Sequence, residues 1–342
     1  MIHRIPTGNA RAVVLVLLVV LAGGLVSGYE RLATEMLVFA LFAVSLNLLL
    51  GYTGLPSLGH GLYFGVGAYS TGILVQRYTE NVLVALVTGL LVGALVAAVV
   101  GLFALRTAGA YFLMLTFAFG QLGLAFTVEF ADLTGGADGL PGILRPQLPV
   151  ASIQLYDPRQ FYYFVAVIVL VALLAVVQLQ RSPFGRTLVG IRENPERMAA
   201  LGFNIWLHRY AAFVVSGAVA GLAGVLIAYL NGFVSPELIG LTTSAEVLLM
   251  VVLGGSGTVL GPLVGAVAIL GLEEFTKGYG DRWRMLLGLM YVITVLLARR
   301  GLVHVVPDLL RRLDRKRRRG SGAPDADVPL ALDRPTTTGG RV

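Results

Sequence analysis

Apolar stretches approaching 20 residues in length recur through most of this sequence, and they decide what the chain can fold into. A helix needs about 20 mostly apolar residues to cross the hydrocarbon core of a membrane. Backbone groups in lipid must be hydrogen-bonded within their own segment, and the alternating pattern of a membrane barrel is absent. The sequence therefore predicts an all-α polytopic membrane protein with about ten transmembrane or partial helices. The expected elements are 13–27, 32–50, 60–76, 82–105, 110–128, 161–179, 210–230, 240–253, 259–272 and 285–298.

Charged residues make up 13% of the 342 residues, against about 25% in soluble domains. The net charge of +7 is concentrated in a few loops and the C-terminal segment, which argues against nucleic acid as a partner. The chain has no cysteine, so disulfides, thiolate metal sites and a cysteine nucleophile are excluded. It also has no P-loop, zinc-protease or nucleophile motif. These absences argue against an enzyme, and we expect no catalytic residue, no metal and no cofactor bound by this chain.

Three of the expected elements could be something other than a full transmembrane helix. Arg4 and Arg11 before the apolar run 13–26 fit a signal peptide, but the many later spans favour a first transmembrane helix. The elements 240–253 and 259–272 have 14 residues each, and at 1.5 Å per residue each rises only about 21 Å. They are predicted to form a hairpin of partial helices buried in protein.

Lysine and arginine residues set the expected orientation. With a cytoplasmic N-terminus, 19 of the 26 basic residues fall inside and 7 outside. The segment after residue 299 and the loop 181–209 decide this difference. We therefore predict a multi-pass protein of the inner (plasma) membrane with both termini in the cytoplasm and the loop 129–160 outside.

The chain is expected to divide into a transmembrane domain, residues 1–310, and a basic cytoplasmic tail, residues 311–342. The tail is rich in Arg, Pro, Asp and Gly and is predicted to be disordered. Its run 315–319 is either a site for anionic membrane lipid or, as we favour, a plain positive-inside anchor.

A glycine-rich segment, residues 51–69, follows the second expected span. Six glycines fall between Gly51 and Gly67, and glycine lets a helix break or approach its neighbour closely. Tyr52, Ser57 and His60 are candidates for lining a transport path, because polar groups at membrane depth usually face a cavity or another helix. For His60 we favour the alternative, a hydrogen-bonded structural residue.

A second glycine-rich segment, residues 254–265, joins the two short elements. Gly257, Gly261 and Gly265 recur every four residues and are predicted to share one helical face. Gly254 and Gly255 separate the two short helices, and interrupted helices at membrane depth indicate a transport site or gate. Inside the first of them, Glu246 is either a functional carboxylate, for proton coupling or contact with a substrate ammonium, or a structural one.

The cytoplasmic loop 181–209 encodes a short helix with both ends marked. Asn194 suits the N-cap, Pro195 the first position and Gly202 the position after the C-cap. Glu196 in the first turn is favoured by the helix dipole, and Glu193 has the spacing to pair with Arg197. Such a helix is too short to be stable alone, so it packs either on a partner or on its own membrane domain.

Several segments together resemble the LivM-like permeases of branched-chain amino acid ABC importers. The likeness covers nearly the whole chain up to about residue 300, although Pro56 and the tail depart from the family pattern. The matching segments are LNLLLGYTG at 46–54, SLGH at 57–60, GAY at 67–69, AYFLMLTFA at 110–118, TGGADGL at 134–140, RENPERMAALG at 192–202, FVVSGAVAGLAG at 213–224 and LGGSGTVLGPLVGA at 253–266.

The resemblance implies ten helices with inverted repeats, and alternating access for Leu, Ile or Val. The implied partners are a second related permease, two cytoplasmic ATPase subunits that hold ATP and Mg, and a periplasmic or lipid-anchored solute-binding protein. The loop 192–202 would then be the coupling helix that docks on the ATPase. Its candidate coupling residues are Arg192, Glu193, Asn194, Pro195, Glu196, Arg197, Ala200 and Gly202.

Other functions stay open at this point. Within the importer class, the cargo is alternatively urea, a short amide or another amino acid. A proton-coupled secondary transporter would rely on Glu246 and His60 and would need no ATPase. The capped cytoplasmic helix argues against it.

Overall fold

The structure, a computed structural model, describes residues 28–145, 155–277, 285, 288–289 and 292. The chain divides into two compact units, Met1–Val303 and His304–Val342, and all described residues belong to the first. The expected spans 13–27 and 285–298 and the boundary at residue 310 lie outside the continuously described residues, as does the tail 311–342.

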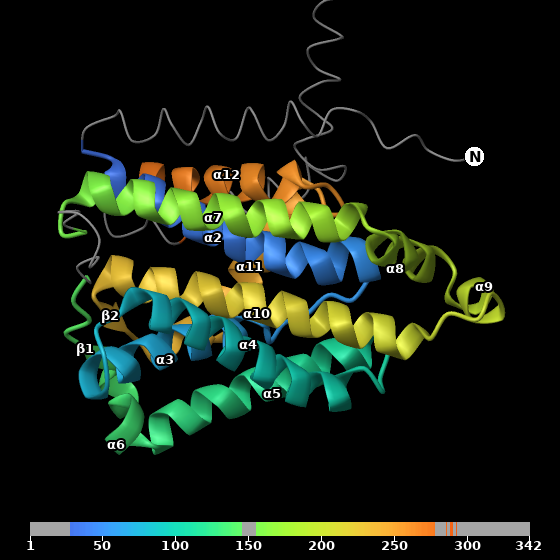
Figure 1. The fold of residues 1–342 in the computed structure, drawn as a ribbon, viewed down its shortest axis with the longest axis horizontal. Coiled ribbons are helices and arrows are strands. Elements are labelled where there is room, and N and C mark those ends of the chain that lie inside the picture. The colour runs from blue at the N-terminus through green and yellow to red at the C-terminus, as the bar shows by residue number, and fades with distance from the viewer. Residues whose placement is uncertain (1–27, 146–154, 278–284, 286–287, 290–291, 293–342) are drawn as a thin grey trace, which may run out of the picture. The chain divides into compact units, whose positions relative to one another are not determined.

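Helices make up almost all of the described chain (Figure 1), so the predicted all-α membrane class is confirmed. The eight expected elements within the described residues each coincide with a helix. The helices are α2 Glu30–Asn47, which continues into the π-helix η1 Leu48–Thr53, α3 His60–Arg77, α4 Val82–Ala104, α5 Ala110–Glu129, α6 Ala131–Thr134, α7 Pro158–Arg181, α8 Pro183–Glu193, α9 Pro195–Ala200, α10 Ile205–Asn231, α11 Leu241–Gly254 and α12 Leu260–Lys277.

Short non-helical elements occupy the end of the molecule opposite α9 (Figure 1). Strands β1 Leu140–Pro141 and β2 Phe233–Val234 pair antiparallel, with Leu140 opposite Val234. The 3₁₀ turns η2 Gly136–Asp138 and η3 Pro236–Ile239 lie near these strands in the sequence. This pairing ties the loop after α5 to the end of α10.

Five of the described helices are long and apolar enough to cross a membrane: α2 with η1, α4, α5, α7 and α10. The surface of α4 shows the corresponding lipid pattern. Leu91 and Leu95 are 58% and 65% exposed, while Gly89, Gly93 and Ala97 of the same helix are buried. A helix in a soluble protein buries its large apolar residues, so this reversal indicates that lipid covers the exposed face.

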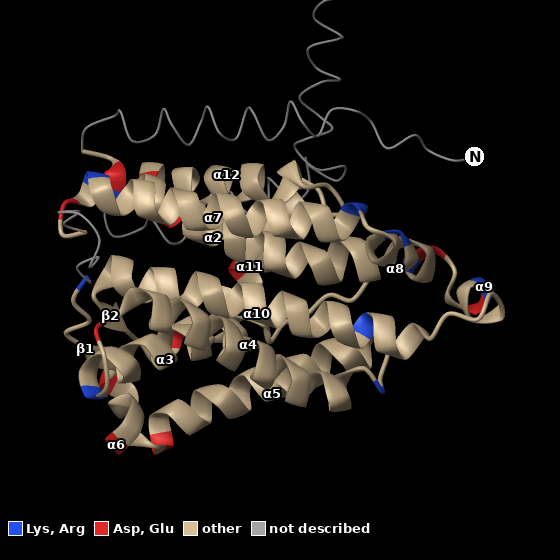
Figure 2. Ribbon diagram, in the orientation of Figure 1, with Lys and Arg blue, Asp and Glu red and all other residues tan. Residues whose placement is uncertain are grey.

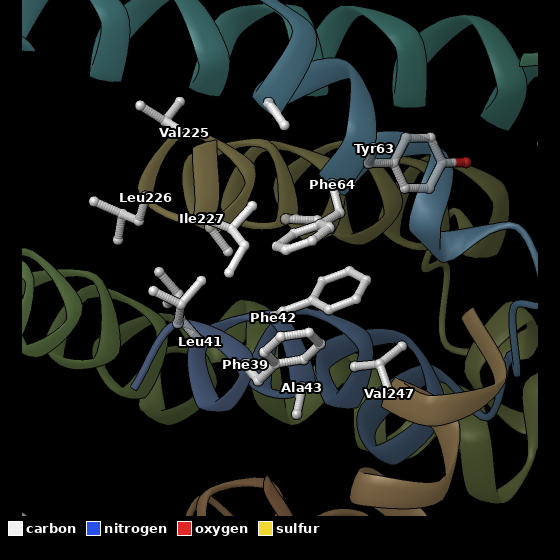
Figure 3. Packing of buried hydrophobic residues seen from close by; sticks show 14 of the residues in the cluster. Phe39, Leu41, Phe42, Ala43, Tyr63, Phe64, Val225, Leu226, Ile227 and Val247 are labelled. Atoms are coloured by element: carbon white, nitrogen blue, oxygen red, sulfur yellow. The ribbon is translucent and has the colours of Figure 1, made fainter. Parts of the chain in front are cut away.

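Glycines allow α3, α4 and α10 to pack at close range. A Cβ added at Gly224 of α10 would lie 2.8 Å from the backbone nitrogen of Ala68, and one at Gly93 of α4 would lie 2.9 Å from the Cα of Gly221. Helix α10 lies between α2 on one side and α3 and α4 on the other (Figure 1). Aromatic rings fill the centre, where Phe42 of α2 stacks on Phe64 of α3 with centroids 4.3 Å apart (Figure 3).

Two expectations about the short elements were wrong. Helix α12 has 18 residues rather than 14, because its last turn is charged and Lys277 pairs with Glu273 at 3.4 Å. Gly257 lies before α12 with φ +81, so only Gly261 and Gly265 share a helical face, and both pack closely on α11. Val252 of α11 and Val267 of α12 are exposed in this single chain, and burial of the hairpin within protein stays a prediction.

Candidate functional site

The loop 181–209 folds into two helices, α8 and α9, and local chemistry marks the ends of each. Ser182 caps α8, accepting a hydrogen bond from the nitrogen of Gly185 at 3.4 Å. Asn194 caps α9, accepting from the nitrogen of Arg197 at 2.9 Å. After α9, Gly202 has φ +86, a left-handed conformation that favours glycine, while a Cβ there would meet nothing within 4 Å. The predicted capped helix is therefore confirmed as a structure.

Helix α9 projects beyond α8 and the start of α10 (Figure 1), and none of its six residues is buried. Helix α9 contacts α8 through the side chain of Met198, which packs against Gly190. A Cβ added at Gly190 would lie only 2.8 Å from the Met198 sulfur. The apolar side chains of Leu201 and Phe203 next to it are exposed, Leu201 by 67%. All eight candidate coupling residues are exposed, namely Arg192, Glu193, Asn194, Pro195, Glu196, Arg197, Ala200 and Gly202. Glu193 and Arg197 form no ion pair with each other, contrary to the spacing argument.

Arg192 differs from the other candidate coupling residues, because its guanidinium is directed toward the membrane helices. Its Nη1 donates a hydrogen bond to the carbonyl oxygen of Gly51 in η1. A Cβ added at Gly257 would lie 3.2 Å from the same nitrogen, and one at Gly54 would lie 3.0 Å from the Cγ of Arg192. The last turn of α8 therefore meets two glycine-rich segments that are far apart in the sequence.

Around this contact, α8 packs on the ends of two spans, α2 with η1 and α10. Leu188 of α8 is buried with Leu48 of η1 and Ala212 of α10, and Tyr52 packs against this cluster. Tyr52 thus lies at the contact with α8. The structure gives it a packing role there.

The glycine-rich segment after α2 is a true break between helices. The α-helix turns into the π-helix η1, a form often found at functional positions. Gly54 ends it with φ +73, and the chain stays irregular until α3 begins at His60. Ser57 within this stretch is fully buried, and its hydroxyl has no hydrogen-bond partner among the described residues.

His60 is buried in a row of small polar groups. The hydroxyl of Ser45 donates to the carbonyl of Phe42 at 2.6 Å, and Ser45 Oγ lies 2.8 Å from His60 Nε2. Because a hydroxyl has one proton, His60 Nε2 is the donor in the second contact. The ring also stacks on Phe42, with centroids 5.5 Å apart. This geometry fits a neutral, structural histidine.

Two further serines extend this row between helices. Ser216 of α10 donates to the carbonyl of Ser45 at 2.5 Å. Ser244 of α11 accepts from the backbone nitrogen of Gly61, at the start of α3, at 2.9 Å. The polar row therefore connects α2, α3, α10 and α11.

The loop between α11 and α12 is held by Asn47, which none of the sequence motifs includes as a candidate. The nitrogen of Gly257 donates to Asn47 Oδ1 at 2.9 Å, and Asn47 Nδ2 donates to the carbonyl of Thr258 at 2.8 Å. Asn47 is one polar residue within the apolar run 46–50, and that isolation was the available signal. Gly254 and Gly255 form the other side of the loop, Gly255 with φ +112.

Glu246 belongs to a separate group of charges. It is half-buried on α11, and its charged neighbours are Glu35 of α2 and Glu273 and Lys277 of α12. Lys277 in turn pairs with Glu273 and Glu274 at 3.4 and 3.3 Å. Within the described residues, no group of three or more His, Asp or Glu side chains is arranged to hold a metal ion.

Comparisons with known proteins agree on one family. A family model described as "Branched-chain amino acid transport system / permease component" matches residues 28–296. The permease protein LivM of a high-affinity branched-chain amino acid transport system from Salmonella typhimurium is 30% identical over 81% of this chain and 70% of its own length. Its counterpart from Escherichia coli K12 is 29% identical over the same shares.

A second kind of permease also matches. The permease protein LivH of the Salmonella typhimurium high-affinity branched-chain amino acid transport system is 26% identical over 69% of this chain and 80% of its own length. No solved structure matches the chain at a significant level. On the family match and on the closer likeness to LivM, this chain belongs to the family of branched-chain amino acid transport system permease components and is LivM-like within it.

Proposed function

We propose that this chain is one permease subunit of an ATP-binding-cassette importer and forms half of the translocation pathway for Leu, Ile and Val. The family match over residues 28–296 and the names of the LivM and LivH relatives support this function and this cargo. The similarity to LivH as well as LivM supports a second, related permease subunit as the partner in the membrane. ATP and Mg would be bound by separate ATPase subunits, and a solute-binding protein would deliver the cargo.

The proposal rests mainly on helix α9, which is ordered although its residues are mostly exposed. This helix is capped at both ends and held on α8 by Met198, yet buries none of its own residues. Isolated helices this short are unstable in water, so an ordered, exposed α9 is suited to contact another protein. Docking on an ATPase subunit accounts for that exposure, and alternating access would follow when the docked helices move.

Charge supports a cytoplasmic position for α8 and α9. Figure 2 shows Lys and Arg on α8, on α9, at the end of α7 and at the start of α10, all at one end of the helices. Six of the eleven basic residues in the described chain lie at this end, and five of the six fall in the loop 181–209: Arg181, Arg186, Arg192, Arg197 and Arg209, with Arg106 outside it. Loops with an excess of Lys and Arg remain in the cytoplasm, where ATP is available.

The test reverses charges on α9 in the complete importer. Glu196→Arg and Arg197→Glu change exposed side chains that make no ion pair within the described chain. We expect each to weaken association with the ATPase subunits and to lower amino acid uptake into vesicles by about tenfold, because like charges across an interface repel. Arg106→Glu, an exposed arginine at the same end but outside α8 and α9, is the control and should have little effect. Normal uptake in both α9 variants would contradict the docking role.

A further inference from the structure

Three segments from distant parts of the sequence meet at Arg192. The guanidinium donates to the carbonyl of Gly51 in η1, and its aliphatic stem lies against Gly54 at the end of that π-helix. The same guanidinium lies beside Gly257, in the loop between α11 and α12. One side chain of α8 therefore touches both helix breaks, the first predicted to lie beside a transport path and the second to form a transport site or gate.

The two helix breaks are also joined directly to each other. Asn47, just before η1, forms hydrogen bonds to Gly257 and Thr258 at 2.9 and 2.8 Å. A Cβ added at Gly51 would lie 2.8 Å from the Cα of Gly257, so the two backbones are in contact. Because close-packed backbones have no room to shift independently, η1 and the hairpin loop are expected to move as one body.

The side chains of the coupling loop therefore fall into two groups. Glu196 and Arg197 of α9 are exposed and point to no partner within the described chain. Arg192, five positions before Arg197 in the sequence, bonds instead to the membrane helices. The guanidinium has five N–H donors on a planar fork, which suits it to hold backbone carbonyls.

We propose that Arg192 is a positioning residue that transmits motion of α8 and α9 to the joined body of η1 and the α11–α12 loop. This inference rests on the proposed function, because the motion starts where α9 docks on the ATPase. It separates two roles within the coupling loop, since the residues of α9 would bind the ATPase while Arg192 would connect the docked helices to the gate. A residue with a purely structural role would stabilise the fold without changing how much transport each ATP drives.

The first experiment measures uptake per ATP hydrolysed in the reconstituted importer. We expect Arg192→Ala to keep its ATPase subunits during purification and to hydrolyse ATP. It should transport about tenfold less amino acid per ATP, as loss of one coupling contact of about 1–2 kcal/mol would give. Arg192→Lys retains the charge and one donor toward Gly51 and should recover part of the coupling. Unchanged uptake per ATP in Arg192→Ala would overturn the proposal.

Loss of the ATPase subunits from Arg192→Ala, as expected for Glu196→Arg, would also overturn it, because Arg192 would then belong to the docking surface. That outcome would leave the proposed importer function intact. The function itself fails if the unaltered chain takes up amino acid without ATP. The two failures are therefore distinguishable in the same preparation.

The second experiment replaces the contact with a reversible covalent bond. A Cβ at Gly54 would lie 4.0 Å from the Cβ of Arg192, within the range of about 3.5–4.5 Å found in disulfides. The chain contains no cysteine, so the double variant Gly54→Cys/Arg192→Cys can form only this intramolecular bond. Under reducing conditions it should be as uncoupled as Arg192→Ala, and oxidation should restore uptake per ATP.

The controls are Gly54→Cys alone, which shows the effect of a side chain at φ +73, and Arg192→Cys alone; neither should respond to the oxidant. Because the reduced and oxidised states are compared in the same folded sample, a general loss of stability does not produce the expected recovery. A disulfide that forms in full while uptake per ATP stays low would show that a rigid link at this point does not carry the motion.

Discussion

Gly93 of α4 faces Gly221 of α10 so closely that a Cβ on Gly93 would lie 2.9 Å from the Cα of Gly221. The carbonyl of Gly217, one turn earlier on α10, closes the same space with a 2.5 Å approach to that Cβ. In lipid, helices associate through such close packing rather than through the hydrophobic effect. The contact between α4 and α10 therefore depends on the absence of a side chain at position 93.

Gly93→Ala should destabilise the protein by about 1–3 kcal/mol, the usual effect of adding a methylene to a filled interface. Gly271→Ala is the matched control, since Gly271 also lies within a helix but a Cβ there would meet only Met36, at 3.8 Å. Alanine favours a helix over glycine by up to about 1 kcal/mol, so Gly271→Ala should be neutral or stabilising. Thermal unfolding in detergent compares the two, and equal melting temperatures would contradict the packing argument.

Asn47→Leu should destabilise the loop between α11 and α12, because it removes the partners of both Gly257 and Thr258. Leaving a buried polar group unpaired costs about 1–3 kcal/mol. Asn81→Leu is the control, because Asn81 accepts one hydrogen bond, from Leu83 at 3.0 Å, at the exposed start of α4. Loss of that cap should cost about 1 kcal/mol.

Both variants can be compared by unfolding temperature and by proteolysis of the loop. We expect a clearly larger loss of stability for Asn47→Leu, with the loop cleaved earlier. If Asn81→Leu proves the more damaging substitution, the bridge from Asn47 does not hold the loop.

The sequence predicted features that depend on neighbouring residues. The spans were found because their length and apolarity are local properties, and the ends of α9 were found because Asn194, Pro195 and Gly202 act within one helical turn. Helix α8 was not recognised separately, because Gly185 and Gly190 interrupt its pattern. The sequence also underestimated α12, whose charged last turn does not look like a membrane span.

Contacts between distant segments could not be predicted. Arg192 was grouped with the other candidate coupling residues, because nothing in a single sequence pairs it with Gly51, which lies 141 positions away. Gly257 has the four-residue spacing of a glycine face on a helix. In the structure it instead lies in a loop with φ +81, where its nitrogen donates a hydrogen bond to Asn47. The conformation and the partners of such residues are set by tertiary contacts, which local sequence patterns do not show.

The buried polar groups lead to a prediction about the energy source. His60→Phe retains the stack on Phe42 and loses the hydrogen bond to Ser45, and Glu246→Gln retains the shape of the side chain without its charge. We expect His60→Phe to lower stability by about 1 kcal/mol, the usual contribution of one hydrogen bond, and neither change to abolish ATP-driven uptake. A protonophore should also leave uptake unaffected. Uptake that needs a proton gradient and disappears in Glu246→Gln would instead support a proton-coupled transporter.

Asn194→Ala tests whether the order of α9 matters for coupling, and α10 offers a matched control. Asn194 and Asn204 are both N-caps whose side chains accept from a backbone nitrogen three residues later, at 2.9 and 3.0 Å. Loss of either cap costs about 1 kcal/mol. Helix α9 has six residues with none buried, whereas α10 has 27 and is packed between other helices.

The same local cost should therefore have different consequences in the two helices. A short helix without buried contacts opens locally, so Asn194→Ala should speed hydrogen exchange of residues 195–200 and lower uptake per ATP, with little change in the unfolding temperature. In Asn204→Ala, tertiary packing holds α10 in place, and uptake per ATP should persist. Hydrogen exchange by mass spectrometry and vesicle uptake measure both effects. Rapid exchange at 195–200 with full coupling would mean that the ATPase itself orders α9 on docking, so that its cap is dispensable.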